Sequence, residues 1–170
     1  RFLPRLVEEL NKGGIKNSDI KVILGLGIHR HHTEKEKTRL VGDYIFNSIK
    51  VIDSDPLAAK LIGKTSAGTP VEVFGKALES DLLIATGNIE YHYFAGYSGG
   101  AKAVMPGICT RNSIQANHSM MLDDRAVPGR AEGNPVREDI EQAGKMAGID
   151  FVFNVILDDS KKIIDAVAGK

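Results

Sequence analysis

Lys21-Val22-Ile23-Leu24-Gly25-Leu26-Gly27 is a short apolar run closed by glycines, and its pattern decides how the chain is expected to fold. The run has the length of a buried strand rather than of a helix. Asp81-Leu82-Leu83-Ile84-Ala85-Thr86-Gly87 repeats the pattern, again with glycine after the apolar residues. Glycine permits a tight turn directly after a strand. Both segments therefore predict buried strands whose carboxyl ends open into loops.

Helical patterns alternate with these strands. Residues 2–10 carry apolar side chains at helical spacing, and Thr33, followed by acidic residues, is typical of a helix start. Asn134-Pro135 predicts another start, because asparagine caps helices and proline fits their first turn. The other expected elements are a helix from Thr110 or Asn112 to about Leu122 and strands at 49–52, 61–65, 70–74, 151–157 and 163–167. This alternation predicts an α/β fold, a Rossmann-like open sheet with helices on both faces.

The composition is that of a soluble globular protein, with 42% hydrophobic and 26% charged residues among 170. Lys+Arg and Asp+Glu both number 22, a balance that excludes a general nucleic-acid binder and a membrane-surface protein. Cys109 is the only cysteine, which excludes an intrachain disulfide. With no secretory signal and no long apolar run, the chain is expected to be cytoplasmic. Its length suits one domain, and its start at Arg1 within a helical pattern is typical of a piece of a longer protein.

The stretch from Asn88 to His118 concentrates reactive side chains. His92 lies among aromatic residues, Lys102 follows a glycine-rich turn, and His118 falls within a predicted helix. Histidine titrates near neutrality and ligates metals, and a deprotonated lysine is a nucleophile. His29 directly follows the first strand quoted above. Because ligands of open α/β sheets bind beyond the carboxyl ends of the strands, we expect His29 and His92 to converge there.

Each of these side chains also has an ordinary structural interpretation. His92 suits a hydrogen-bonded position in the core, and Lys102 suits a surface loop. A single histidine in a helix, such as His118, is often structural or exposed. His31 and His32 are predicted to lie in a solvated loop before the helix cap. Taken separately, the residues do not decide between these interpretations and a functional site.

Two other functional classes can be read from the residues alone. Gly25-x-Gly27 lacks the third glycine of a dinucleotide fingerprint, so it predicts only a tight turn. A zinc-dependent hydrolase would use His29, His31 and His118, although no acid or cysteine accompanies them at metal-ligand spacing. A non-catalytic phosphate- or nucleotide-binding module would hold its ligand with the amides and the lysine of residues 98–102.

The order of the motifs is more specific than any one of them. The motifs are Gly27-Ile28-His29-Arg30, His92-Tyr93-Phe94-Ala95-Gly96-Tyr97-Ser98-Gly99-Gly100-Ala101-Lys102, Pro106-Gly107, Asn117-His118 and Gly133-Asn134-Pro135-Val136. Through them the chain closely resembles the nickel-pincer lactate racemase family of 2-hydroxyacid racemases and epimerases. The similarity covers nearly all of the chain. It implies that residues 1–170 form a single α/β cofactor-binding domain, a fragment of a longer two-domain protein.

The resemblance also implies a role for each motif residue. Lys102 would tether the nickel-pincer nucleotide, a pyridinium mononucleotide, through a thioamide link, and His118 would ligate the nickel. His29 and His92 would be the paired acid/base groups on opposite sides of a small 2-hydroxyacid such as lactate. The cofactor-binding residues would be Lys102, Ser98, Gly99 and Gly100.

The implied reaction is racemisation or epimerisation by proton-coupled hydride transfer. One neutral histidine takes the hydroxyl proton while hydride moves to the cofactor, and return of hydride on the other face inverts the carbon. The implied partners are the small 2-hydroxyacid substrate, the missing C-terminal domain of the same protein and the cofactor-biosynthesis proteins, with no nucleic acid and no membrane. Without the biosynthesis proteins, a recombinant sample is expected to lack the cofactor.

Three departures from the family pattern bear on activity. The Asp-x-Thr-Arg segment of the family should lie just before Arg1 and is absent. The second domain, with its glutamine and lysine contacts, is also absent. Ala101 stands where many members have proline. We therefore expect the isolated chain to fold but to have little or no activity.

Overall fold

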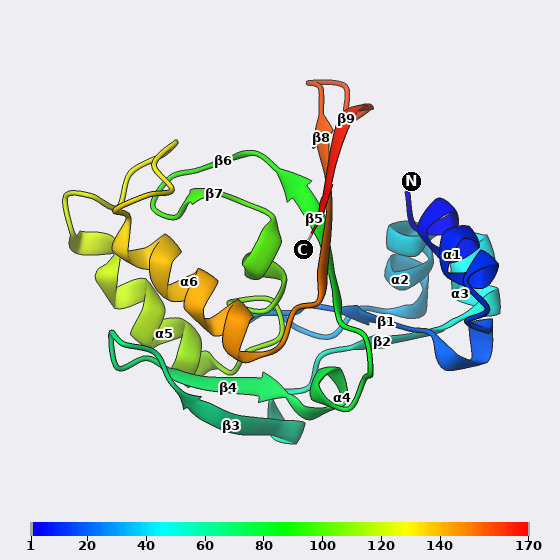
Figure 1. Cartoon of the computed structure of the whole chain (residues 1–170), viewed down its shortest axis with the longest axis horizontal. Helices are drawn as coiled ribbons and strands as arrows, with labels where there is room; N and C mark the ends of the chain where they lie inside the picture. The colour runs from blue at the N-terminus through cyan, green and yellow to red at the C-terminus, as the bar shows by residue number, and fades with distance from the viewer. Residues whose placement is uncertain (1, 170) are drawn as a thin grey trace.

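Helices and strands alternate along the computed structural model of the chain, which describes residues 2–169 (Figure 1). The α-helices are α1 (Leu3–Lys12), α2 (Glu34–Val41), α3 (Asp43–Ser48), α4 (Gly75–Leu78), α5 (Arg111–Ser119) and α6 (Pro135–Met146). The strands are β1 (Lys21–Leu24), β2 (Lys50–Asp53), β3 (Ala59–Lys64), β4 (Pro70–Phe74), β5 (Ile84–Ile89), β6 (Tyr91–His92), β7 (Gly96–Tyr97), β8 (Phe151–Leu157) and β9 (Ile163–Gly169). Short 3-10 helices are η1 (Asn17–Asp19), η2 (Pro56–Ala58), η3 (Gly100–Ala103) and η4 (Met120–Leu122).

Three helices begin at predicted caps. The side chains of Thr33, Thr110 and Asn134 each accept a backbone N–H from the first turn of α2, α5 and α6 respectively. At Thr33 the cap is reciprocal, because the Glu36 carboxylate accepts the Thr33 N–H at 2.8 Å. Of the two candidates for the α5 cap, Thr110 is the residue that is used. The predicted helix starts are therefore confirmed.

The first part of the chain forms a parallel βαβ unit. β1 pairs with β2 from Lys21 opposite Lys50 to Leu24 opposite Asp53, and α2 and α3 connect the two strands. A small apolar cluster joins α1, α2 and α3 to this pair, formed by Val7, Val41, Ile45 and Ile49. This packing brings the carboxyl ends of both strands to the same edge.

The larger core lies around β4, η3, α5 and α6. Its fully buried side chains include Val71, Val73, Met105, Val136 and Ile140. β3 and β4, which lie at two of the predicted strands, form an antiparallel hairpin. The loop after η3 crosses β4, where the Phe74 N–H donates to the Ile108 carbonyl at 2.9 Å. The core therefore fixes the segment between Lys102 and α5 against a strand.

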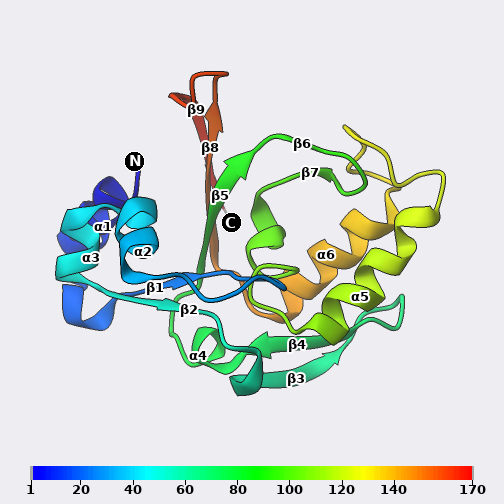
Figure 2. The same cartoon turned by 180° about the vertical axis from the view of Figure 1, so that it is seen from behind.

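The third group of strands is β5-β8-β9, with β5 parallel and β9 antiparallel to β8. Helices α1, α2 and α3 lie on one side of this sheet and α5 and α6 on the other (Figures 1 and 2). The mixed α/β class with open sheets and helices on both sides is as predicted. Within residues 2–169, however, the strands pair as four small sheets rather than as one continuous sheet.

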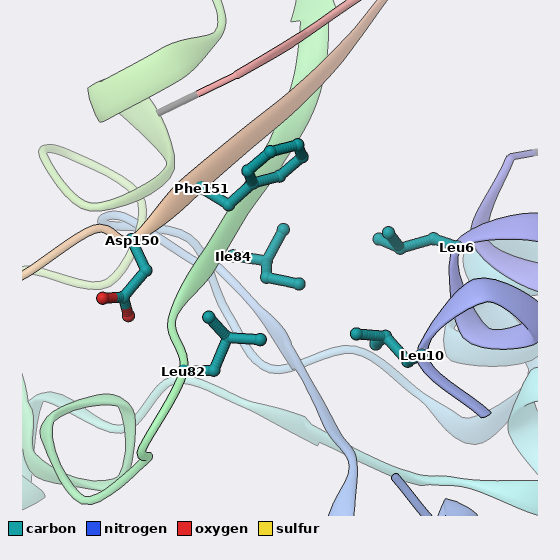
Figure 3. Close-up of a pocket in the computed structure, with 6 residues that line it drawn as sticks. All are labelled: Leu6, Leu10, Leu82, Ile84, Asp150 and Phe151. Carbon is teal, nitrogen blue, oxygen red and sulfur yellow. The ribbon is translucent and has the colours of Figure 1, made fainter. Parts of the chain in front are cut away.

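An apolar cavity of about 400 Å³ lies between α1 and the strands β5 and β8. Leu6 and Leu10 face Ile84 and Phe151 across it (Figure 3). The lining is apolar apart from Asp150 and includes none of the predicted proton-transfer groups. Among the helices of residues 2–169, none has the length and apolarity to cross a membrane.

Replacing Asn134 tests the connection between α6 and the loop that carries His92. Asn134 is fully buried, caps α6 and donates to the Phe94 and Arg130 carbonyls at 2.9 and 3.2 Å. Asn134→Ala removes the cap and leaves these carbonyls without their donor, so the free energy of unfolding should fall by about 2–4 kcal/mol in urea titrations. The exposed Asn47→Ala control on α3 should change it by less than about 0.5 kcal/mol. Equal effects of the two variants would contradict this role.

Candidate functional site

Two of the predicted site residues, His92 and His118, pack against one phenylalanine, and a third, Lys102, lies near both. The Phe94 ring meets the His92 ring edge-on at 4.6 Å and the His118 ring at 5.0 Å, both measured between centroids. Lys102 lies close enough to both histidines for its charge to lower their pKa values. His92 comes from β6, Lys102 from η3 and His118 from α5. The fold thus assembles two imidazoles and one amine from three separate elements.

His92 has a defined environment in the short β6–β7 hairpin. Its ring stacks on Tyr93 with centroids 5.1 Å apart, and its Nδ1 accepts the Ala95 N–H at 3.2 Å. Burial lowers the pKa of His92, and the Lys102 and His118 charges lower it further, against the opposing effect of Glu90. The neutral ring, with its proton on Nε2, is therefore the favoured form.

Lys102 is half-buried at the start of the core segment. Burial, followed by the charge of Arg137, lowers the pKa of its amine to about 8, although Glu90 acts in the opposite direction. Arg137 is itself held by a hydrogen bond to the Tyr97 carbonyl at 3.0 Å and by an ion pair with Glu141. A substantial fraction of the Lys102 amine is consequently neutral near physiological pH, which is the nucleophilic form.

His118 lies near the end of α5 with its Nδ1 buried and without a hydrogen-bond partner in residues 2–169. Burial lowers the pKa of His118, and Lys102 adds to this shift, whereas the Ile114 carbonyl opposes it. The neighbouring Asn117 is fully buried and donates to the Asp139 carboxylate at 2.8 Å. Asp139, also buried, accepts the Thr65 hydroxyl as well. This network fixes α5 at the place where it presents His118.

The glycine-rich turn before Lys102 is only partly open to a ligand. The Ser98 hydroxyl donates to the Asn88 carbonyl at 2.7 Å and accepts the Glu90 N–H at 2.9 Å. The Gly100 N–H approaches the Asn154 side-chain oxygen at 3.4 Å. The Gly99 N–H donates to no other residue that the structure describes, and Gly99 has a φ of 80°. Ser98 and Gly100 therefore shape the turn, while the Gly99 amide remains available.

His29 lies in the loop after β1 and does not touch the other three residues. No hydrogen bond or ring contact within residues 2–169 joins it to His92, Lys102 or His118. The connection between the two groups is made by backbone, because the Gly27 N–H donates to the Gly107 carbonyl at 2.9 Å. A Cβ at Gly25 would lie 2.8 Å from that same carbonyl oxygen. Gly107 thus holds the His29 loop against the segment that follows Lys102.

The two remaining histidines differ from each other. His31 is largely exposed, as predicted. His32 is not simply solvated, because its Nδ1 lies 2.8 Å and its N–H 2.9 Å from the Asp53 carboxylate oxygens. Burial alone would raise the pKa of Asp53, but the hydrogen bonds from His32 and Lys37 outweigh it, and the net shift is downward. The prediction of a solvated loop is therefore wrong for His32, whose partner lies far away in sequence.

Several residues that shape the site were not anticipated. They are Asp53 at the end of β2, Asn117 and Asp139 between α5 and α6, and Arg137 beside Lys102. Asp53 offered one signal in the sequence, since it is an acid that directly follows an apolar strand. Such an acid becomes buried only when partners cover it. The others are recognisable only when the packing of α5 against α6 is known.

The comparisons with known proteins show the family of the chain. The family described as the lactate racemase N-terminal domain matches residues 1–129. The chain belongs to this family. The lactate racemase of Thermoanaerobacterium thermosaccharolyticum is 36% identical over 172 residues, which cover 98% of this chain and 40% of that protein. The lactate racemase of Lactiplantibacillus plantarum is 36% identical over 155 residues, covering 88% of this chain and 37% of that protein.

Solved structures give the same result. The lactate racemase apoprotein of Thermoanaerobacterium thermosaccharolyticum superposes with a TM-score of 0.91 at 35% identity, over 98% of this chain and 41% of that one. A crystal structure of a Thermotoga maritima protein gives a TM-score of 0.70 at 21% identity over 87% of this chain and 41% of that one, which shows the fold alone. The chain thus spans about two fifths of the length of the relatives it matches.

The side chains around Phe94 fit a tethered metal cofactor of the kind the resemblance implies. Lys102 offers an amine with a lowered pKa, and His118 offers a neutral imidazole with a buried, unpartnered nitrogen. Within residues 2–169 no group of three or more His, Cys, Asp or Glu side chains is placed to hold a metal ion. If His118 is the only protein ligand, the other ligands of the metal would have to come from an organic cofactor.

The pKa of Lys102 can be tested by amine modification. Only the neutral amine reacts, so the rate at Lys102, followed by peptide mass spectrometry, should reach half its limiting value near pH 8. Arg137→Gln removes a charge that lowers this pKa and should move the midpoint to higher pH. Arg5→Gln, an exposed change on α1, should leave it in place. A midpoint near the ordinary lysine value of about 10 would contradict the burial of this amine.

Gly107 can be tested by adding a single methyl group. Its Cβ would lie 2.1 Å from the Ala103 carbonyl oxygen, which is backbone and has little freedom to move. Gly107→Ala should therefore lower the free energy of unfolding by more than about 2 kcal/mol in urea titrations. Gly169→Ala, where the added carbon meets nothing within 4 Å, is the matched control. A Gly107→Ala protein as stable as this control would show that the contact is not a constraint.

Proposed function

We propose that this chain is the cofactor-binding part of a racemase or epimerase that inverts the hydroxyl-bearing carbon of a small 2-hydroxyacid such as lactate. One observation carries the proposal: His92 and His118, both favoured in the neutral form, lie against Phe94 beside the Lys102 amine. Proteins named lactate racemase, 36% identical to the chain, support the same reaction class. The chain is proposed to act as a single domain, residues 1–170, within a longer two-domain protein.

The proposed cofactor is a nickel-pincer nucleotide. Lys102 would hold it covalently through the amine, and His118 would supply a nitrogen ligand to nickel. Gly99 would donate its free amide to the cofactor, with Ser98 and Gly100 holding the turn in shape. When bound, this group would supply the hydride acceptor that breaking an unactivated C–H bond requires.

The protein's own part in the reaction is to move the hydroxyl proton. With Nδ1 accepting the Ala95 N–H, neutral His92 carries its proton on Nε2 and can donate a hydrogen bond to a substrate oxygen. His92 can take the hydroxyl proton on Nε2 only after its own proton has moved to Nδ1, which requires release of the Ala95 N–H. Its lowered pKa favours return of that proton to the substrate.

His29 would serve the opposite face of the substrate. Its side chain makes no hydrogen bond within residues 2–169, so both ring nitrogens are available to a ligand. Two acid/base groups are needed because the two enantiomers present their hydroxyls in different directions. The Gly27–Gly107 hydrogen bond would set the spacing between His29 and the His92 group.

The rest of the proposed protein would complete the site. The curated relatives are more than twice as long as the matched region, so further substrate contacts and the exclusion of water would come from their remaining part. We therefore propose that the isolated chain has little or no activity, and that cofactor-biosynthesis proteins must load Lys102.

The zinc hydrolase interpretation has no support from the geometry. His29 and His31 lie beside one cavity, whereas His118 packs against Phe94. In the described part of the chain these three histidines form no group able to hold a metal ion. For a phosphate-binding module, the turn offers only the Gly99 amide and the Lys102 amine as donors. The proposed cofactor would use both of these groups.

The decisive test combines intact mass with an isotope experiment on the full-length protein, produced together with the cofactor-biosynthesis proteins. A mass addition on Lys102 and racemisation of lactate are expected, and racemisation in D2O should leave hydrogen at C2 because hydride is retained.

Lys102→Arg should abolish both the mass addition and activity, whereas Lys76→Arg, on the exposed face of α4, should change neither. His92→Asn should keep the mass addition and lower kcat by about 100- to 10,000-fold. Unmodified Lys102 in an active enzyme would contradict the proposal.

A further inference from the structure

A second cavity, of about 160 Å³, opens where the loop after β1 approaches the start of α5. It is lined by residues 26–29, His31, Pro56 and Arg111. In Figure 2 the blue loop after β1 runs toward the α5 side of the molecule, which brings these distant segments together. The cavity therefore lies next to His29, away from the Phe94 group.

The guanidinium of Arg111, an exposed residue, lines this cavity without an ion-pair partner in residues 2–169. Arg111 forms no hydrogen bond or ion pair with any residue in the range 2–169, and the His29 side chain forms none either. Arg111 is also the first residue of α5, whose helix dipole adds positive potential there. Two groups that favour an anion thus share one small cavity, and neither is neutralised by the protein.

The acidic side chains of the neighbouring elements are already engaged. Asp53 is buried and is held by His32 and Lys37, with His31 at 3.4 Å. The Glu72 carboxylate accepts the Thr110 hydroxyl and the Asn112 amide. Asp55, beside Pro56, accepts the Leu57 N–H at 2.9 Å. No carboxylate in the described chain is therefore paired with Arg111, and its charge remains available to a ligand.

The size of the cavity limits the ligand. Water occupies about 30 Å³ per molecule in the liquid, so this volume holds about five such units. A molecule of about six heavy atoms, or one phosphate group of a larger molecule, matches that size. A guanidinium binds both carboxylate and phosphate through paired N–H donors.

We propose that Arg111 and His29 form a subsite for the oxyanion end of a ligand. The inference rests on the proposed function and deepens it: the oxyanion is either the carboxylate of the 2-hydroxyacid or the phosphate of the tethered nucleotide. Arg111 binds the oxyanion, and this anchors the ligand beside the His29 imidazole. Arg111 is a binding residue that the resemblance did not identify.

The test compares Arg111→Gln and Arg111→Lys with the exposed control Arg5→Gln in the full-length, cofactor-loaded enzyme. If the carboxylate binds here, Arg111→Gln raises KM for lactate about 10- to 100-fold while the mass addition on Lys102 is unchanged. If the phosphate binds here, KM is unchanged and the fraction of enzyme carrying the mass addition falls by a similar factor. Arg111→Lys keeps the charge without the paired donors and should give a smaller effect of the same kind.

The subsite is wrong if Arg111→Gln leaves both KM and the loaded fraction within twofold of the wild type. Failure of the proposed function looks different, because the wild-type protein would then show neither racemisation nor a mass addition. In that case acetate and inorganic phosphate are titrated against the same wild-type and Arg111→Gln proteins by calorimetry. Binding of either anion that Arg111→Gln weakens at least tenfold supports the subsite, and equal affinity in the two proteins overturns it.

Discussion

A contact between backbone segments, at Gly107, sets the geometry on which the rest of the site depends. Its N–H donates to the Lys102 carbonyl at 3.2 Å, and its carbonyl accepts the Gly27 N–H at 2.9 Å. A side chain at Gly25 would collide with Gly107, and one at Gly107 would collide with the Ala103 carbonyl, so neither residue has room for one. The loop that carries His29 and the turn that carries Lys102 are therefore both hydrogen-bonded to Gly107.

Electrostatic coupling makes the second constraint. Lys102 lowers the pKa of both His92 and His118, and Arg137 lowers that of Lys102. Each positive charge thus disfavours protonation of its neighbour, and burial also disfavours the charged forms. Near neutral pH the arrangement favours uncharged imidazoles without burying a carboxylate among them. A neutral imidazole can serve as a metal ligand or as a base. His92 and His118 differ mainly in the residues that surround them.

The sequence predicted those features that depend on local chemistry. The caps at Thr33 and Asn134 follow from side-chain oxygens that reach the next turn of backbone, and the apolar runs fix the strands. The attachment of His32 to Asp53 and of Asn117 to Asp139 was not predictable, because the partners are about twenty residues apart and meet only in the folded chain. The division of the strands into separate sheets has the same origin, since pairing depends on how whole units pack. The motif order indicated His92, Lys102 and His118 together, while the packing of both histidines against Phe94 was visible only in the structure.

The stacking of Tyr93 on His92 also gives this protein an optical property. The chain has four tyrosines and no tryptophan, so tyrosine alone dominates its ultraviolet emission. The Tyr93 ring lies parallel to the His92 imidazole within 7°, and it is largely exposed to solvent. A charged imidazolium against the face of a phenol ring alters its electronic environment. Protonation of His92 is therefore expected to change the fluorescence of Tyr93.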